Sequence, residues 1–190
     1  MTVRPAALAV TVLLAASGAE AALPWSAQPA LPVTRSEAWG ASTGGIFYVI
    51  GGWDAFGTAQ DTVQAFDPGA GTWSFRSSMP TPREGAPVVA LNCKIYVIAG
   101  NDNAGGGGLH NELEESDPVT DTWRSRAAAP AALEGAAAAV LGGRIYLVGG
   151  FNGITNTAAA YVYDPAINLW AALPPMTTGR FWPGAAVLGG

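Results

Sequence analysis

Three seven-residue stretches decide the fold: IFYVIGG at residues 46–52, KIYVIAG at 94–100 and RIYLVGG at 144–150. Each has a central tyrosine, two aliphatic residues after it and a closing glycine, and each is apolar at nearly every position. A strand of this kind is covered on both faces, as a strand inside a packed set of sheets is. The closing glycine permits a turn or a close backbone approach that a side chain would block.

The closing glycines lie 48 and 50 residues apart. A second marker has the same period: Trp73, Trp123 and Trp170, each six residues after the aspartate of an Asp-Pro pair, lie 50 and 47 residues apart. Proline removes a ladder donor and aspartate closes a turn, so each pair is expected to end a third strand. A period near 50 is too long for the helical pair of a solenoid and matches four short strands with their turns.

These elements, in this order, resemble the kelch repeat. IYLVGG, AYVYDPAINLW and Arg180 follow the kelch motif nearly element for element, and FDPGAGTW with MPTPR does so in the first copy. The second copy departs from it, with Ala99 in place of a glycine and Ser116 in place of the aromatic residue before Asp117. The resemblance covers essentially everything after Ala22, and it implies an all-β, kelch-type β-propeller built from four-stranded blades.

The repeat register divides the chain into blades. We expect three complete blades at about residues 36–78, 84–128 and 134–175, with a lone fourth strand at 25–31 before them and one first strand, ending at Gly190, after them. These elements make fourteen strands of a partial propeller. Closed propellers have about four to eight blades, so the sequence predicts truncation at the C-terminus. The alternative left open is a half-propeller that pairs with a second copy, because an uncapped array exposes an apolar face.

The alanine-rich run RAAAPAALEGAAAAVLGG, at residues 126–143, gives two conflicting signals. Alanine is the best helix former, so propensity alone favours a helix. The equivalent runs RSSMPTPREGAPVVALNC and TTGRFWPGAAVLGG carry proline and glycine residues that interrupt a helix. The repeat register therefore predicts strand, turn and strand here.

The composition limits the partners. With 190 residues, of which 49% are hydrophobic and 12% charged, the chain is expected to be globular. Its formal net charge is −5 and Lys94 is its only lysine, so it offers little to a phosphate backbone or an anionic membrane surface. We therefore expect no nucleic acid and no membrane surface as partner. The acidic stretch ELEESD, residues 112–117, is expected to form the solvated face of a third strand.

The N-terminal residues resemble a secretory signal peptide. Arg4 precedes an apolar run at residues 6–16, and AEA at 19–21 is a small-x-small cleavage site. A membrane anchor is the alternative, but the run is shorter than the roughly 20 apolar residues that a spanning helix needs. We expect residues 1–21 to be removed, residues 22–190 to form the kelch segment without a membrane span, and the protein to be secreted or periplasmic.

Few residues can supply the nitrogen or sulfur ligands of a transition metal such as copper. His110 is the only histidine and Cys93 the only cysteine, so the chain has no internal disulfide, and Cys93 is expected to be a buried, small apolar group. Galactose oxidase, built on the same repeat, holds copper with histidines, tyrosines and a cysteine crosslink, which this chain cannot supply. We expect no metal site and no cofactor.

Strand direction separates the loops onto two faces. Because the strands alternate in direction, the links from second to third strand and from fourth strand to the next blade lie on one face. These links are long and varied: GWDAFGTAQD, NDNAGGGGLHNE, FNGITNT, MPTPREG and PMTTGRFWPG. The links on the opposite face are tight. We expect any function to lie on the side of the long links, here called the long-loop face.

Three arginines occupy equivalent positions before the first strands. Arg35, Arg83 and Arg180 should ring the central channel on the long-loop face, while Leu133 breaks the pattern. The kelch resemblance implies that such a ring contacts acidic ligands. The alternative is that each arginine belongs to the framework of the repeat, stacked on an aromatic ring or paired with a glutamate such as Glu84.

Aromatic and polar side chains complete the candidate binding site. Besides the arginines, the candidate ligand-binding residues are Trp53, Phe151, Trp182, Glu84 and Asn101. The aromatic members, with Phe181 beside them, suit the stacking of sugar rings or the side chains of a peptide. The alternative is that these rings pack the loops against the next blade.

The leading hypothesis is an exported, non-catalytic kelch protein that recognises a protein or a glycan through the long-loop face. The alternative is a carbohydrate-active kelch enzyme, oxidase-like or similar to the exported sialic-acid mutarotases, with catalytic groups partly beyond residue 190. The mutarotases need only carboxylate and arginine side chains, so Glu37, Glu84 and the arginines are compatible with this alternative. The sequence assigns no catalytic residue.

Overall fold

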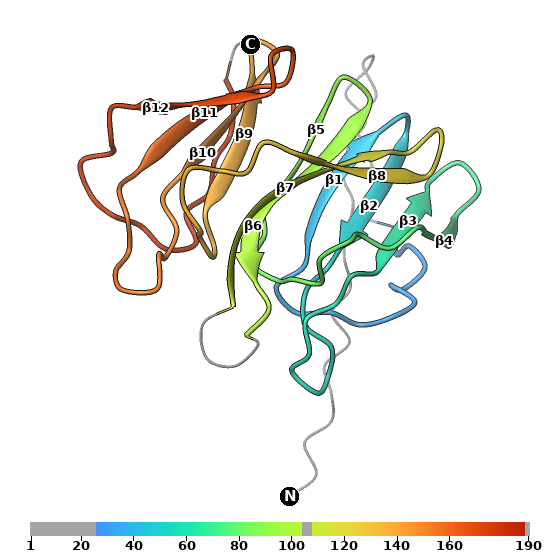
Figure 1. Ribbon diagram of the computed structural model, residues 1–190. Coiled ribbons are helices and arrows are strands. Elements are labelled where there is room, and N and C mark those ends of the chain that lie inside the picture. The colour runs from blue at the N-terminus through green and yellow to red at the C-terminus, as the bar shows by residue number, and fades with distance from the viewer. Residues whose placement is uncertain (1–25, 104–107, 189–190) are drawn as a thin grey trace, which may run out of the picture.

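The structure, a computed structural model, describes residues 26–103 and 108–188, and these residues form three four-stranded antiparallel sheets (Figure 1). They hold twelve strands and no helix, and thus no helix with the length and apolar character needed to cross a membrane. The expected all-β architecture is confirmed. The expected signal peptide, residues 1–21, lies outside the described residues.

Each sheet contains four consecutive strands in sequence order. The first sheet comprises β1 (Trp39–Thr43), β2 (Ile46–Ile50), β3 (Val63–Asp67) and β4 (Thr72–Arg76). The second comprises β5 (Val88–Leu91), β6 (Lys94–Asn101), β7 (Leu109–Asp117) and β8 (Thr122–Arg126). The third comprises β9 (Ala137–Leu141), β10 (Arg144–Val148), β11 (Ala160–Asp164) and β12 (Leu169–Leu173). This is the arrangement of three propeller blades, so the partial propeller is confirmed.

The second blade lies between the other two, and the first strands β1, β5 and β9 are neighbours (Figure 1). Side chains of a strand alternate between its two faces, so the second blade contributes to two cores. Val88, Ile95 and Val97 belong to the core shared with the first blade. Tyr96 and Ile98 belong to the core shared with the third.

Tryptophan side chains tie each fourth strand to the preceding blade. Nε1 of Trp123 donates a hydrogen bond to the carbonyl oxygen of Ser77 over 2.9 Å, and Nε1 of Trp170 donates to that of Ala127 over 2.8 Å. Trp73 makes the equivalent bond to the segment that precedes β1. The three tryptophans therefore have equivalent surroundings, as the repeat period requires.

The glycine that closes each second strand lets two blades approach. The N–H of Gly52 donates to the carbonyl oxygen of Arg83 over 3.1 Å, and the N–H of Gly150 donates to that of Arg180 over 2.8 Å. Their φ angles are +87° and +94°, which disfavour a side chain. A Cβ at Gly52 would also lie 2.5 Å from the carbonyl oxygen of Ser36. Glycine is thus required here by both conformation and space.

The tight turns of the opposite face show that the expectation for Cys93 is wrong. Asn92 and Cys93 join β5 to β6 with φ angles of +52° and +59°, as Gly142 and Gly143 join β9 to β10 with +57° and +74°. Two successive positive φ angles are typical of the type I′ hairpin turn. Cys93 is therefore exposed at a turn, not buried in an inner strand.

The two strands expected before the first blade and after the third are also absent from the described residues. Residues 26–31 and 184–188 form no strand, which leaves twelve strands rather than fourteen. A strand needs a ladder with a partner, and no described strand pairs with either segment. Side chains hold the first segment and the residues after it instead: the carbonyl oxygen of Pro29 accepts the indole N–H of Trp73, and the Gln64 side chain bonds both the N–H and the carbonyl of Val33.

The acidic stretch at residues 112–117 is not a solvated face. Glu114 and Glu115 are each only 2% exposed, because partner side chains cover both faces of β7. Glu114 forms an ion pair with Arg83 at 2.9 Å, and Glu115 forms one with Arg126 at 3.3 Å. Neighbouring residues of a strand point to opposite faces, so each acid pairs on a different side of the blade.

The alanine-rich run follows the repeat register and not its helix propensity. β9 pairs antiparallel with β10 from Ala137 opposite Val148 to Leu141 opposite Arg144. Pro130 lies in a bend before the strand. Pairing within the blade therefore overrides the local preference of alanine for a helix.

Candidate functional site

A series of backbone hydrogen bonds runs from blade to blade at the centre of the long-loop face. The N–H of Gly85 donates to the carbonyl oxygen of Glu37 over 3.3 Å, and the N–H of Gly135 donates to that of Gly85 over 2.9 Å. The N–H of Trp182 then donates to the carbonyl oxygen of Gly135 over 2.9 Å. These four residues share one position of the repeat, and they fix the centre of the arrangement.

That position is left-handed in every copy. The φ angle is +55° at Glu37, +58° at Gly85, +56° at Gly135 and +52° at Trp182. Glycine adopts this conformation readily, whereas a residue with a Cβ pays roughly 1–2 kcal/mol. Non-glycine residues in strained conformations cluster at functional sites, so the backbone singles out Glu37 and Trp182.

Short backbone bridges fasten the long loops to the same centre. Glu84 and Asn101 exchange two backbone hydrogen bonds of 2.9 and 3.0 Å, and Glu134 and Phe151 exchange two of 3.0 and 2.8 Å. Trp53 makes the equivalent bridge in the first blade. The candidates Trp53, Asn101 and Phe151 thus occupy equivalent positions around one centre.

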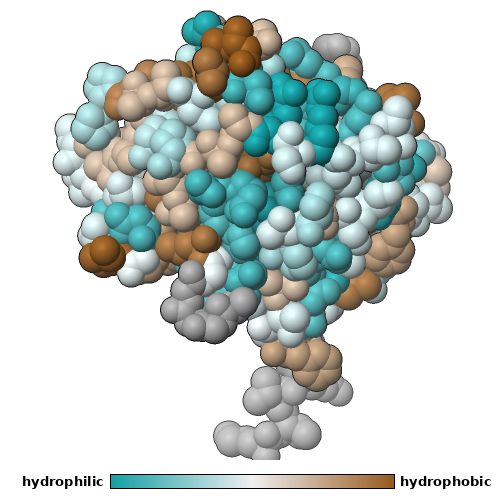
Figure 2. Space-filling view, in the orientation of Figure 1, coloured by the Kyte–Doolittle hydropathy of each residue, from teal (hydrophilic) through white to brown (hydrophobic). Residues whose placement is uncertain are grey.

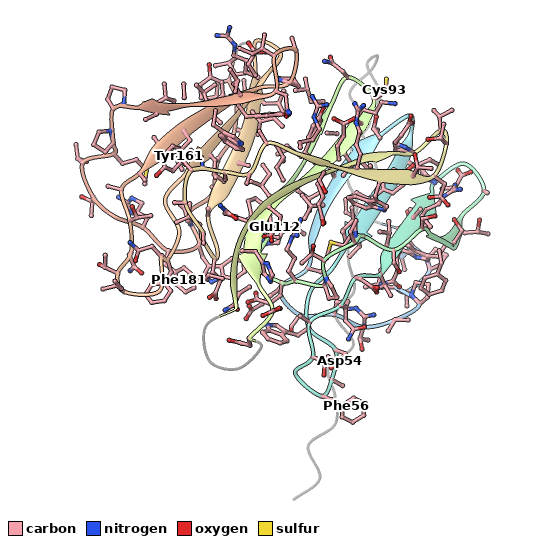
Figure 3. All side chains as sticks on the ribbon, in the orientation of Figure 1. Asp54, Phe56, Cys93, Glu112, Tyr161 and Phe181 are labelled. Carbon is pink, nitrogen blue, oxygen red and sulfur yellow. The ribbon has the colours of Figure 1, made fainter. Side chains whose placement is uncertain are left out.

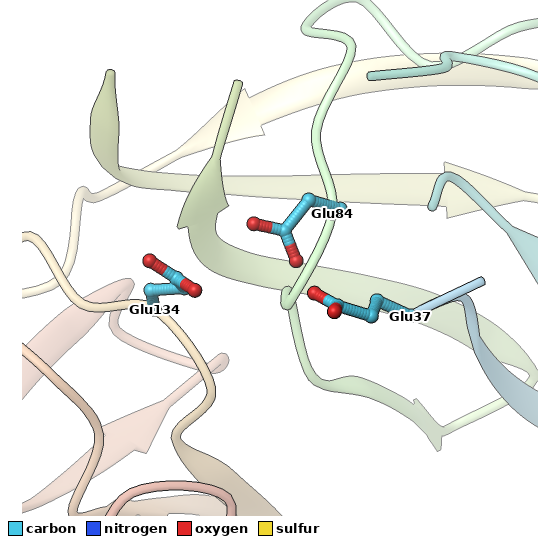
Figure 4. Close-up of side chains that lie close together, drawn as sticks. All are labelled: Glu37, Glu84 and Glu134. Atoms are coloured by element: carbon cyan, nitrogen blue, oxygen red, sulfur yellow. The ribbon is translucent and has the colours of Figure 1, made fainter. Parts of the chain in front are cut away.

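Three carboxyl groups meet there (Figure 4). Glu37, Glu84 and Glu134 each place one carboxyl oxygen within 4.8 Å of the other two. Figure 4 shows the Glu84 carboxyl group between the other two. Glu37 is exposed, Glu134 is half-buried and Glu84 is only 2% exposed. Glu134 was not predicted from the sequence, although it has the same place in Leu-Glu-Gly (residues 133–135) as Glu84 has in Arg-Glu-Gly (residues 83–85).

Burial alters the acidity of the middle carboxyl group. Desolvation is the largest of the causes that together raise the pKa of Glu84 to about 9, and a hydrogen bond with Glu37 and the charges of Glu134 and Glu37 also contribute. At neutral pH this carboxyl group therefore holds a proton unless a cation neutralises it. No N–H or hydroxyl donor among the described residues reaches its Oε2.

Asn101 orients the third carboxyl group. This residue is 8% exposed, and its Nδ2 donates to Oε2 of Glu134 over 2.9 Å. Its own Oδ1 accepts the N–H of Asn103 over 2.7 Å. Because the amide is held at both ends, it fixes the direction of the Glu134 carboxylate.

Four aromatic rings form a row beside the carboxyl groups. The ring centroids of Phe151 and Phe181 are 6.0 Å apart, and those of Phe181 and Trp182 are 5.7 Å apart. Trp182 then stacks on Trp39 at 5.8 Å, with the ring planes 7° apart. Phe181 and Trp182 remain 40% and 37% exposed, so part of this row is open to a ligand. Trp39 was not singled out by the sequence.

The side chains confirm that the two sets of loops lie at opposite ends. Asp54 and Phe56, from the β2–β3 loop, lie on the same side of the molecule as Phe181, and Cys93 lies on the other side (Figure 3). Phe56 is 92% exposed. In Figure 2, hydrophilic residues form a band over the middle of the molecule, and strongly hydrophobic residues lie in small groups nearer its edge. Exposed apolar side chains are thus dispersed on this view, not gathered in one broad patch.

Arg83 has the framework role that the sequence left open as the alternative. Its side chain is 0% exposed, forms an ion pair with Glu114 at 2.9 Å and donates to the carbonyl oxygen of Val97 over 3.3 Å. Burial lowers the pKa of Arg83, and the charge of Glu114 opposes that shift. Arg83 therefore stabilises the junction of two blades and does not reach the surface.

The other two predicted arginines have surroundings that differ from those of Arg83. Arg35 is half-buried and donates to Oγ1 of Thr62 over 2.9 Å and Oε1 of Gln60 over 3.4 Å. Arg180 is exposed, and its backbone N–H donates to the carbonyl oxygen of Thr157 over 3.1 Å. The groups that the structure brings together at the centre of the long-loop face are acidic and aromatic.

A pocket of about 490 Å³ opens beside this centre. Its wall includes Leu31, Trp39 and Phe47, and the charged residues Arg35 and Glu37 lie at it as well. An apolar pocket with a few polar groups is the usual form of a small-molecule site. Arg35 and Glu37, unlike Arg83, are therefore placed where they could contact a ligand.

Comparisons with known proteins agree with this architecture. The model of the kelch motif matches residues 35–80, 82–128 and 133–177, one match for each blade. An F-box/kelch-repeat protein of Arabidopsis thaliana is 35% identical over 79 residues, which are 42% of this chain and 21% of that protein. Kelch-like protein 35 of Mus musculus is 41% identical over 76 residues, which are 40% of this chain and 13% of that protein.

Among solved structures, that of YjhT matches with a TM-score of 0.68 and 19% identity, covering 79% of this chain and 54% of that one. An identity this low shows a common fold alone. In each of these comparisons the aligned region is less than two thirds of the other protein. The three kelch motifs nevertheless take up most of the chain and coincide with its three blades, so this protein is a member of the kelch-repeat family.

Proposed function

We propose that this chain is an exported, non-catalytic recognition protein that binds a protein or a glycan at the centre of the long-loop face. The observation that carries the proposal is the convergence there of the row of aromatic rings with three carboxyl groups. Export rests on the signal-peptide pattern of residues 1–21.

The chemistry of the centre suits contact with a ligand better than it suits packing alone. Phe181 and Trp182 are held by their neighbours yet more than one third exposed, so a flat sugar face or an apolar side chain could stack on them without a large loss of rotamer freedom. The carboxylates of Glu37 and Glu134 would accept hydrogen bonds from sugar hydroxyl groups or from a cationic side chain. Both classes of ligand use the same polar acceptors beside the same rings.

A second candidate function is catalysis on a reducing sugar, of the kind expected for a mutarotase-like kelch enzyme. One observation favours it: the protonated Glu84 lies beside Glu37, so one carboxyl group could donate a proton while the other accepts one. Interconversion of sugar anomers needs that pair of transfers, to the ring oxygen and from the anomeric hydroxyl. The exposed Arg180 and half-buried Arg35 could bind an acidic sugar.

Two measurements test these proposals. Binding of the purified chain to a glycan array and to an array of synthetic peptides should give specific signals, and the absence of any signal on both would contradict the recognition proposal. Anomer exchange of reducing sugars, including sialic acid, is followed by nuclear magnetic resonance. If native protein makes anomer exchange faster than it is in buffer, and Glu37→Gln does not, the enzyme hypothesis is favoured over non-catalytic recognition.

A further inference from the structure

We propose that Glu37, Glu84 and Glu134 form a binding site for a divalent cation, with Ca²⁺ as the ion that fits best. Three consecutive blades each contribute one carboxyl group to it. The site does not depend on the proposed recognition of a protein or glycan, and the two can be tested apart.

The upper limit on the spacing of the oxygens admits a large ion. Three oxygens no more than 4.8 Å apart have a common point at most about 2.8 Å from each, which is 4.8 Å divided by √3. Ca²⁺ lies about 2.3–2.6 Å from its oxygen ligands, so the glutamates need to move little or not at all. Mg²⁺ requires about 2.0–2.1 Å and a stricter geometry. Carboxylate oxygens are also the ligands that Ca²⁺ prefers.

The buried carboxyl group of Glu84 is the independent sign of a ligand. The residue is only 2% exposed, yet apart from the neighbouring carboxyl group of Glu37 no donor among the described residues reaches its Oε2. Figure 4 shows this carboxyl group directed into the space between Glu37 and Glu134. A buried carboxylate without a donor is costly, and such groups are usually explained by a proton or a bound ion.

No basic side chain in the described part of the chain neutralises the three glutamates. The ion pairs there engage Arg83 with Glu114 and Arg126 with Glu115, and none includes the cluster. The charged groups that act on Glu84 are themselves carboxyl groups. A cation from solution is therefore the group that would neutralise the three carboxylates.

Hydrogen bonds hold the backbone around the three glutamates in place. The hydrogen bond from Gly85 to Glu37 fixes two blades, and that from Gly135 to Gly85 fixes the third. Asn101 orients Glu134, as outer partners commonly orient metal ligands. A Cβ at Gly85 would lie 3.0 Å from Cγ of Glu134, so the absence of a side chain at Gly85 leaves room for the side chain of Glu134.

The response to Ca²⁺ distinguishes an ion site from a shared proton. A cluster whose carboxyl groups only share a proton would show no saturable response to Ca²⁺.

The experiment uses terbium(III), which prefers the same oxygen ligands, on the full chain after treatment with a chelator. The Cη2 atom of Trp182 lies 3.6 Å from the Cβ position of Gly85, beside the cluster, so excitation of tryptophan should sensitise bound terbium. We expect a saturable luminescence that Ca²⁺ displaces at lower concentration than Mg²⁺ does. Glu84→Gln should weaken terbium binding at least about tenfold. Asp61→Asn, which removes the same charge from the β2–β3 loop, should leave it within about twofold.

The proposal is overturned if native protein gives no saturable signal, or if Glu84→Gln binds terbium as tightly as native protein. Circular dichroism establishes whether Glu84→Gln is folded. If it is not, Glu37→Gln, which alters an exposed side chain, decides by the same criterion. If native protein binds terbium but gives no signal on either array, the recognition proposal is contradicted and the proposed cation site is not.

Discussion

The indole nitrogen of Trp123 donates a hydrogen bond of 2.9 Å to the backbone carbonyl of Ser77, across the boundary between the first and second blades. Because this bond is exposed, water can replace it in part, and Trp123→Phe should lower the free energy of unfolding by only about 1 kcal/mol. Trp123→Ala also removes the ring and should cost about 3 kcal/mol. Urea unfolding measures both. Ser77→Ala keeps the backbone carbonyl and is the control. A Trp123→Phe variant as stable as native protein would show that this hydrogen bond does not stabilise the junction of the blades.

The glycines of the two faces should respond differently to a methyl group. Gly44 and Gly51 have similar φ angles, +59° and +66°. A Cβ at Gly44 meets nothing within 4 Å, whereas one at Gly51 would lie 2.4 Å from the carbonyl oxygen of Arg83. Gly44→Ala should therefore cost only the backbone strain, about 1–2 kcal/mol, and Gly51→Ala clearly more. Equal midpoints in urea for the two variants would show that close approach of the blades is not what Gly51 provides.

The buried pair of Arg83 and Glu114 should show strong coupling. Glu114→Ala leaves the arginine charge buried without its partner and should cost about 3–5 kcal/mol. Replacing both residues, as Arg83→Met with Glu114→Leu, should cost less than the sum of the single changes, since no charge remains to be desolvated. A double-mutant cycle in urea measures the coupling. Additive single effects would mean that the ion pair contributes nothing across the junction.

Stability should depend on pH through Glu84. Its pKa is 4.5 in the unfolded chain and about 9 in the folded protein, so between these values the folded state binds more protons. The free energy of unfolding contributed by this group is then greatest below pH 4.5 and is lost as the pH rises toward 9. Thermal unfolding in a chelator should show this fall in native protein and a flatter profile in Glu84→Gln. Parallel profiles would assign the dependence to other groups.

Much of the fold could be predicted from spacing because each repeat carries its own markers. The tryptophan bonds a carbonyl about one repeat earlier, and the closing glycine bonds one in the link to the next blade, so their period marks the blade boundaries. The alanine run at residues 126–143 is the clearest case, since pairing of β9 with β10 outweighs its helix propensity. The failures came where position within a blade mattered: Cys93 lies in a turn, and Glu114 and Glu115 lie on an interior strand.

The candidate site was harder to predict because its groups come from different blades. Arg83 has the same repeat position as Arg180, yet only Arg83 meets a carboxylate inside the junction of two blades. Glu37 is one position out of register with Glu84 and Glu134, and a left-handed backbone brings it to them. Repeat register alone does not show a contact that depends on such a shift.

Trp182 is the residue at which a single change alters the binding face and also relieves backbone strain. It holds the left-handed position that is glycine in two other repeats, so Trp182→Gly relieves about 1–2 kcal/mol of backbone strain. The change also loses the stacking on Trp39, about 0.5–1.5 kcal/mol, and the packing of a ring that is only 37% exposed. The relief of strain therefore offsets part of the loss, and thermal unfolding should show a folded variant with a lowered melting temperature. Val119→Ser, at an 86% exposed residue of the β7–β8 turn, is the matched change on the opposite face.

The most direct measurement is the affinity of native protein, Trp182→Gly and Val119→Ser for the glycan or peptide that gives the strongest array signal. Recognition at the centre of the long-loop face predicts a loss of at least about tenfold for Trp182→Gly, as expected for an aromatic hot spot, and no change for Val119→Ser. Unchanged affinity in Trp182→Gly, or a loss confined to Val119→Ser, would contradict it.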